Sequence, residues 1–144
     1  MPFQKKISQL NNIKKNLNRF IGESALRHSN IIEDSITEEQ LFEKGIDGFG
    51  KRLAPYSPVT VEIKKLKGQP FDRTTLRDSG DFHSSIKVKL QKDGIKIESD
   101  PIKEDTNLLE VYGEEILFLT EENLTEFRNV LLKDDLIKNI RAAL

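Results

Sequence analysis

The chain has 144 residues, no cysteine and a formal net charge of −1 at pH 7, and 33% of its residues are charged. Because cysteine is absent, disulfides, cysteine-ligated zinc and iron–sulfur clusters are excluded. The length suits one domain, and the high charged fraction predicts a thin core with much surface left for partners. No apolar run approaches the roughly 20 residues that a membrane span needs, and the polar start lacks the apolar core of a signal peptide. We therefore expect assembly in a cytoplasm, with no membrane partner.

Charged residues are distributed unevenly along the chain. Residues 1–27 carry six basic residues against one acidic residue, and residues 51–77 carry seven against two. Residues 104–126 carry eight acidic residues and no lysine or arginine. Either these charges are spread over solvated faces, where they partly cancel, or a basic face of one copy meets an acidic face of the next. The second interpretation predicts head-to-tail contacts, which build rings or stacks.

The first part of the chain carries two helix signals. Apolar residues recur at steps of three and four, which predicts an amphipathic helix over residues 5–27, within an N-terminal helical segment of residues 1–34. Thr37 and Gln40 match a capping box, so we expect a second helix to begin at Thr37. Gly45 is the expected left-handed stop of that helix.

Residues 45–75 are predicted to form a long extended loop. Three glycines lie between residues 45 and 50, prolines follow at 55 and 58, and a Gly-Gln-Pro turn occupies residues 68–70. Such residues break regular structure, and long loops inside compact domains are usually functional or disordered. Within this loop, residues 60–66 fit either a helical turn or a strand.

The C-terminal part, residues 76–144, begins with a hairpin signal. Apolar and polar residues alternate on both sides of a Lys-Asp-Gly turn at 92–94, which predicts a β-hairpin over residues 86–98 with one buried face. Two apolar stretches follow, at 110–112 and 116–119. They fit a third strand or a packed loop.

The last predicted element is a helix that Thr120 caps, with Phe127 on its apolar stripe. The order of elements predicts a single α+β domain over residues 1–144. It comprises N-terminal helices, a long loop, a small antiparallel β-sheet made of a hairpin and a short strand, and a C-terminal helix.

One residue group has the spacing of a metal site. Asp78, Asp81 and His83 lie within six residues and offer oxygen and nitrogen ligands. The same Asp-Ser-Gly-Asp sequence also describes a turn that enters a helix, and no second cluster completes the coordination. We therefore favour the structural interpretation and expect no metal.

The long loop of residues 45–75, which we call the basic loop, fits two further functions. Glu62 and Lys64, with Asp47 upstream, resemble the carboxylates and lysine of metal-dependent nucleases. Tyr56 and Phe71 interleave with the basic residues, as a stacking platform for single-stranded nucleic acid requires. The same cations also suit a surface that docks on an acidic protein.

Four stretches of the sequence carry a family resemblance. They are GIDGFG at 45–50, LAPYSPVT at 53–60 with Lys64 beyond it, LRDSGDFHSSI at 76–86, and YGEEILFLT at 112–120. The pattern is similar to that of tailed-phage virion morphogenesis and tail-completion proteins, which include neck, head–tail connector and minor tail proteins. Its motif residues, which we expect to be structural, are Leu76, Ser79, Gly80, Phe82 and Ser85. Ser79 replaces a commoner Thr and Phe82 a commoner Leu, and both keep the chemistry of the position.

The resemblance implies a structural, non-enzymatic role without a cofactor. Proteins of this kind are adaptors at the head–tail junction or the tail end, where they form rings around the DNA channel. The implied partners are copies of the same chain and other neck, portal or tail proteins, and DNA passes through the lumen without sequence-specific contact. The implied location is the virion neck or tail, after assembly in the host bacterial cytoplasm.

Two surfaces are expected to make these contacts. We assign the gripping of neighbours to the loop around residues 51–67. Ring closure is assigned to the basic helix of residues 5–27 or to the loop, meeting the acidic block of residues 104–126. The expected interface residues are Lys51, Arg52, Tyr56, Lys64, Lys65, Lys67, Glu114, Glu115, Glu121 and Glu122. The alternative function is that of a small phage nucleic-acid-binding protein or a metal-dependent nuclease.

Overall fold

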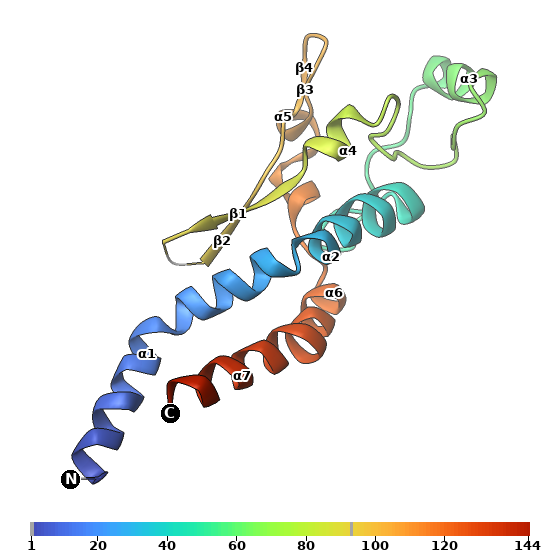
Figure 1. Cartoon of the computed structure of the whole chain (residues 1–144). Helices are drawn as coiled ribbons and strands as arrows, with labels where there is room; N and C mark the ends of the chain where they lie inside the picture. Colours follow the sequence, from blue (N-terminus) through green and yellow to red (C-terminus); the bar gives the residue numbers. More distant parts are fainter. Residues whose placement is uncertain (1, 93) are drawn as a thin grey trace.

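The computed structural model describes residues 2–92 and 94–144, and Figure 1 shows its arrangement. The chain begins with three successive helical segments, α1 (Pro2–Arg27), α2 (Ser29–Asp34) and η1 (Ser35–Lys44), the last of them π-helical. α1 forms a long arm whose first turns extend beyond the rest of the fold, and the N-terminus lies at its far end (Figure 1). The helix predicted over residues 5–27 is confirmed.

The helix start predicted at Thr37 is wrong. Thr37 lies inside η1, where its Oγ1 donates a hydrogen bond to the Glu33 carbonyl oxygen, one turn earlier, at 2.9 Å. The helix runs through this point because Ile32 and Ile36, four residues apart, are both fully buried on its inner face. A capping sequence inside a longer apolar period therefore does not begin a helix here.

The middle of the chain is irregular but holds two short helices, α3 (Pro58–Leu66) and α4 (Asp81–Ser85). Gly45 ends η1 in the left-handed conformation, with φ 62° and ψ 41°, as predicted. α3 lies inside the stretch predicted as a long loop and settles residues 60–66 as helical. Ser57 caps it by accepting a hydrogen bond from the Thr60 backbone N–H at 3.2 Å, and Pro58 occupies the first turn.

Two small antiparallel sheets follow. β1 (Lys87–Gln91) pairs with β2 (Gly94–Glu98), and β3 (Ile102–Lys103) pairs with β4 (Thr106–Asn107). In the first sheet Val88 lies opposite Ile97 and Leu90 opposite Ile95, so the apolar side chains share one face. The predicted hairpin is confirmed.

The third strand that was one option for residues 110–119 does not form. Most of these residues lie in α5 (Leu108–Tyr112) and in the 3₁₀ helix η2 (Glu114–Leu117), and residues 118–119 are irregular. The Asn107 side chain starts α5 by accepting hydrogen bonds from the Leu109 and Glu110 backbone N–H groups at 3.0 and 3.4 Å. Gly113 separates the two helices with φ 90°.

The C-terminal helix runs through three segments, α6 (Glu121–Glu126), the π-helical η3 (Phe127–Leu132) and α7 (Lys133–Ala143). Thr120 caps it, as predicted, by accepting a hydrogen bond from the Asn123 backbone N–H at 3.2 Å. α7 runs back along α1, and the C-terminus lies beside the α1 arm (Figure 1). The two helices are joined at the chain end, where Gln9 Nε2 donates to the Leu144 carbonyl oxygen at 3.3 Å.

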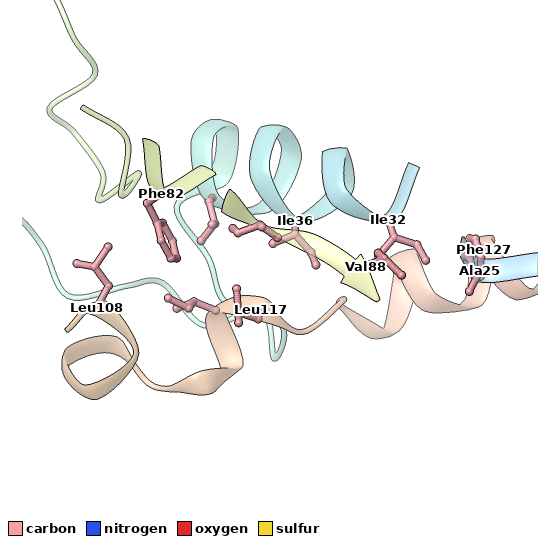
Figure 2. Close-up of a cluster of buried hydrophobic side chains, with 11 residues drawn as sticks. Ala25, Ile32, Ile36, Phe82, Val88, Leu108, Leu117 and Phe127 are labelled. Carbon is pink, nitrogen blue, oxygen red and sulfur yellow. The ribbon is translucent and has the colours of Figure 1, made fainter. Parts of the chain in front are cut away.

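The core lies where these elements meet. Figure 2 shows Ile32 and Ile36 on the inner side of the α2–η1 helix. They face Phe82, Val88 and Leu117 across the core. The cluster extends to Ala25 and Phe127 at one end and to Leu108 at the other (Figure 2). Helices from both ends of the chain and short antiparallel strands build this core, which confirms the α+β class. In the described part of the chain, no helix is long and apolar enough to cross a membrane.

Candidate interaction surfaces

Tyr56 and Lys64, both predicted to contact partners, lie inside the fold of the basic loop. The Thr75 backbone N–H donates to the Tyr56 hydroxyl oxygen at 3.0 Å. Lys64 is buried; its Nζ lies 5.3 Å from the centre of the Tyr56 ring and donates to the Arg77 carbonyl oxygen at 2.7 Å. These two residues therefore attach α3 to the segment that follows it.

Asp78 is the second attachment point of this loop. Lys67 Nζ donates to Asp78 Oδ1 at 2.9 Å, Gln69 Nε2 donates to it at 3.2 Å, and Lys103 of β3 lies 3.6 Å from Oδ2. The hydrogen bond from Lys67, followed by that from Gln69, lowers the pKa of Asp78 to about 2. Lys67 is thus engaged by its own chain, as is Lys65, whose Nζ lies 3.2 Å from Glu62 Oε1.

Two arginines hold the end of the loop against η1. Arg73 Nε donates to the Phe42 carbonyl oxygen at 2.8 Å, and the Arg77 guanidinium lies 4.6 Å from the centre of the Phe42 ring. Arg77 also lies 3.3 Å from the Glu38 carboxylate. Most of the positive charge predicted to grip neighbours is therefore used to order the loop.

Lys51 and Arg52 lie at the loop surface, where Arg52 NH2 donates to the Asp72 carbonyl oxygen at 3.3 Å. Both side chains are exposed, and in the described residues neither forms an ion pair within 4.0 Å. The turn that presents them is held by Asp47, whose Oδ1 accepts hydrogen bonds from the Phe49 and Lys51 backbone N–H groups at 2.9 and 3.0 Å. The Asp47 carboxylate therefore holds a turn, whereas in a nuclease site it would bind a metal ion.

The spaced metal ligands do not converge. Asp78 faces lysines, and His83 is buried with Nε2 2.8 Å from the Thr75 carbonyl oxygen, to which it donates. Burial lowers the pKa of His83, so the imidazole is held neutral. Within residues 2–92 and 94–144, no group of three His, Cys, Asp or Glu residues is arranged to hold a metal ion.

The five family-motif residues lie in the segment that leads into α4 or in α4 itself. Gly80 takes the left-handed conformation, with φ 91°, and the Ser79 Oγ accepts from the Asp81 backbone N–H at 3.3 Å. Leu76 has the unusual φ of 55° and packs on the core. Phe82 is buried in the core, and Ser85 Oγ accepts from the Asp100 backbone N–H at 2.9 Å.

The predicted acidic residues lie on two neighbouring elements. Glu114 and Glu115 begin η2, and Glu121 and Glu122 occupy the first turn of α6, where the helix dipole favours acidic side chains. Glu115 also fixes the basic loop through its backbone, because its carbonyl oxygen accepts from the Gly48 N–H at 2.8 Å.

The fold adds a second set of acidic residues that the linear charge pattern did not reveal. Glu39 and Glu43 of η1 lie near Glu122 of α6, and together these carboxylates raise the pKa of Lys44, chiefly through its hydrogen bond with Glu39. The four-residue steps from Asp34 to Glu38 and from Glu39 to Glu43 were the available signal. This spacing marks an acidic surface only because the fold places α6 beside η1.

A groove runs between these two helical stretches. A cavity of about 340 Å³ is lined by apolar residues of α2 and η3, with Glu39 and Glu126 at its rim. It adjoins a hollow of about 500 Å³ over η1 that shares Ile31, Ser35 and Glu39 with it. We call the two together the acidic groove. Its principal residues are Ile31, Asp34, Glu39, Glu43, Glu126 and Val130.

The α1 arm is attached to the body at its C-terminal end. Asp135 of α7 accepts hydrogen bonds from Ser24 Oγ at 2.6 Å and from Arg27 NH1 at 3.1 Å, and His28 Nε2 lies 3.0 Å from the same oxygen. The Ser24 hydrogen bond, with those groups, lowers the pKa of Asp135. The arm is thus held at its base.

Comparison with known proteins gave no match to this chain. No family model matches it, and neither a curated protein nor a solved structure is similar to it at the level taken as significant.

Proposed function

We propose that this protein is a structural component of a tailed-phage virion, a head–tail connector or tail-completion protein. In this role it assembles with copies of itself as a ring around the DNA channel. It joins the neck or portal to the tail, and DNA passes through the lumen without sequence-specific contact. The protein is assembled in the host bacterial cytoplasm and resides in the neck or tail of the virion.

The observation that carries the proposal is the separation of unpaired opposite charges on different elements. Lys5, Lys6, Lys14 and Lys15 are exposed on α1, and none of them forms an ion pair within the described residues. The same holds for Asp34, Glu43, Glu122 and Glu126 around the acidic groove. Complementary surfaces on one chain favour contacts between copies, and head-to-tail contacts close into rings.

α3 supports a second kind of contact, with a neighbouring protein. Val59, Ile63 and Leu66 recur at steps of four and three on this helix and are exposed, Leu66 to 89%. Figure 1 shows α3 projecting from the fold at the end opposite the α1 arm. Because the loop around α3 is held by Tyr56, Lys64 and Asp78, this apolar face is presented in a fixed orientation.

The proposal is tested with the virion itself. Particles assembled without this protein should accumulate as separate heads and tails in electron micrographs, and the wild-type chain supplied in trans should restore joined particles. The Leu66→Asp variant should restore fewer joined particles than wild type, whereas Ile102→Asp, an exposed apolar residue of β3, should restore them fully. Joined, infective particles without the protein would contradict the proposed role.

A separate assay tests the enzymatic alternative. The purified chain should leave supercoiled plasmid intact in the presence of Mg²⁺. Magnesium-dependent nicking that the Glu62→Gln substitution abolishes would replace the structural proposal with a nuclease.

A further inference from the structure

The N-terminal half of α1 carries an apolar stripe that the fold leaves uncovered. Phe3, Ile7, Leu10 and Leu17 lie on one side of the helix and are all exposed, Phe3 to 76% and Leu10 to 57%. Ile13, at the edge of this stripe, is buried, so α1 packs on the fold by the adjoining edge and leaves the stripe itself exposed. At a rise of about 1.5 Å per residue, the stripe from Phe3 to Leu17 is roughly 21 Å long.

The spacing within this stripe is that of a helix that packs against other helices. Its members follow steps of four, three, four and three, with Lys14 as the one charged member, which is the seam of a left-handed helical packing. The stripe is flanked by Lys6 and Lys15. The partner surface therefore needs to be apolar along its floor and acidic at its edges.

A second α1 is a poor partner for this stripe. The helix carries six basic residues against one acidic residue, and Lys14 of one helix would face lysines of the other. Like charges at such an interface are destabilising. The charge balance thus argues against pairing through α1 alone.

The acidic groove has the required chemistry. Ile31 and Val130 are apolar and partly exposed there, and Asp34, Glu43 and Glu126 supply negative charge. Lys44 also lines the groove, but it is paired with Glu39 at 3.1 Å, so the surface stays acidic. Its two hollows, of about 340 and 500 Å³, are of the size that accepts a few large side chains. The walls are the helices α2–η1 and α6–η3, so a third helix can lie between them as in a helical bundle.

The α1 of the same chain does not reach this groove. It continues into α2, one wall of the groove, through only His28, and its base is held to α7 by Asp135. We infer that the apolar stripe of α1 docks into the acidic groove of a second copy. Phe3, Ile7 and Leu10 then fill the apolar floor, and Lys14 meets the carboxylates at the edge. The contact is head-to-tail, so each copy offers one helix and one groove.

This inference rests on the proposed self-assembly, because it names the two surfaces that join. The test uses two variants of the whole chain at exposed positions, Leu10→Glu in the stripe and Val130→Lys in the groove. In sedimentation velocity, wild type should form oligomers whose mass rises with concentration. Each variant should have at least a tenfold higher Kd and remain monomeric at concentrations where wild type associates.

Mixing the two variants gives the sharper result. Leu10→Glu retains an intact groove and Val130→Lys retains an intact helix, so the mixture should form one-to-one dimers and nothing larger. Ile102→Glu, an exposed apolar position on β3, is the matched control and should assemble like wild type. Circular dichroism and thermal unfolding of every variant show whether its fold is kept.

The electrostatic part of the helix–groove contact is tested by salt and by charge reversal. Association should weaken as salt is raised, and Lys14→Glu should weaken it further. Adding Glu126→Lys to the partner that supplies the groove should recover part of the lost affinity.

The outcomes separate this inference from the proposed function. If wild type associates and the folded stripe and groove variants associate equally well, the helix–groove contact is wrong while self-assembly stands. If both variants are monomeric and their mixture gives no dimer, the pairing of these two surfaces is wrong. A wild-type chain that stays monomeric at millimolar concentration overturns the contact and the ring, whereas the particle experiment still decides the virion role.

Discussion

Gln40 and Asn123 meet in the core, where Asn123 Nδ2 donates a hydrogen bond to Gln40 Oε1 at 3.0 Å. The same Gln40 oxygen accepts from the Thr120 backbone N–H at 3.0 Å, and Gln40 Nε2 donates to the Phe118 carbonyl oxygen at 2.8 Å. Gln40 is completely buried. One side-chain amide in η1 therefore holds the start of the C-terminal helix and satisfies the backbone groups that lead into it.

Replacing Gln40 by Met should cost about 3 kcal/mol of unfolding free energy. Methionine fills a similar volume, so the packing changes little, but Phe118 O, Thr120 N–H and the Asn123 amide lose their partner inside the core. Each unsatisfied buried group costs about 1–3 kcal/mol. Urea unfolding measures the loss. The matched Gln4→Met, at an exposed position of α1, should change stability by less than about 0.5 kcal/mol.

The signals that predicted structure correctly are local ones. Gly45 ends η1 because glycine adopts its φ of 62° at least cost, and the cap at Thr120 needs only the N–H of a residue three positions on. The hairpin follows from an alternation of period two. The sequence pattern does not identify the α5–η2 stretch as helical, because short apolar runs suit either strand or helix. Asn107 before α5 was the local signal that decides it.

The functional surfaces depend on contacts that no local pattern contains. Lys64 stands among exposed lysines in the sequence, yet it is buried because the carbonyl oxygen of Arg77, thirteen residues later, receives its ammonium group. The acidic groove exists because the core brings α6 beside η1. The family-motif residues lie in the segment that leads into α4 and in α4 itself, and their expected structural role stays a prediction.

His83 should make stability depend on pH. Burial, together with the positive charge of Arg77, lowers the pKa of His83, although its hydrogen bond to Thr75 and the negative charge of Glu38 oppose this shift. Folding therefore favours the neutral imidazole. Its contribution is complete above about pH 6.5, the ordinary histidine value, and is lost as pH falls from there towards the folded pKa.

NMR titration of the two histidine side chains tests this directly. The His83 resonances should titrate below pH 6.5, and unfolding measured by urea should require less denaturant at pH 5.5 than at pH 7.5. His83→Gln should reduce that difference, whereas His28→Gln should keep the part that arises from His83. A midpoint for His83 at or above 6.5 contradicts the assignment.

Asp78 should contribute stability at neutral pH that acid removes. Its hydrogen bonds from Lys67 and Gln69 hold its pKa at about 2, below the ordinary 3.8. The contribution is complete above pH 3.8 and disappears as pH falls through about 2. Because Asp78 is partly exposed, solvent screening limits the effect of Asp78→Asn to about 1 kcal/mol at pH 7. Unfolding curves at pH 7 and pH 3 measure it, and the difference between wild type and Asp78→Asn should shrink at the lower pH.

The control for this measurement is Asp72→Asn. Asp72 also pairs with a basic residue, Arg73, but its side chain is 72% exposed. Its replacement should change stability by less than that of Asp78 at both pH values. Equal effects of the two substitutions would show that Asp78 does not tie α3 to β3.

Gly48 should be intolerant of even a methyl group. A Cβ at this position would lie 2.6 Å from the Phe118 carbonyl oxygen and closer still to the Phe118 Cβ, and the backbone there is held by the hydrogen bond from Gly48 N–H to Glu115 O. Gly48→Ala therefore forces the basic loop away from η2 and should cost about 2–3 kcal/mol. Gly50→Ala meets no atom within 4 Å but strains a φ of 78°, so about 1 kcal/mol is expected. The Tm of Gly48→Ala should be well below that of Gly50→Ala. Proteolysis should also cut the 45–57 segment faster in Gly48→Ala. If the two variants unfold at the same temperature, the loop is not held by its close approach to Phe118.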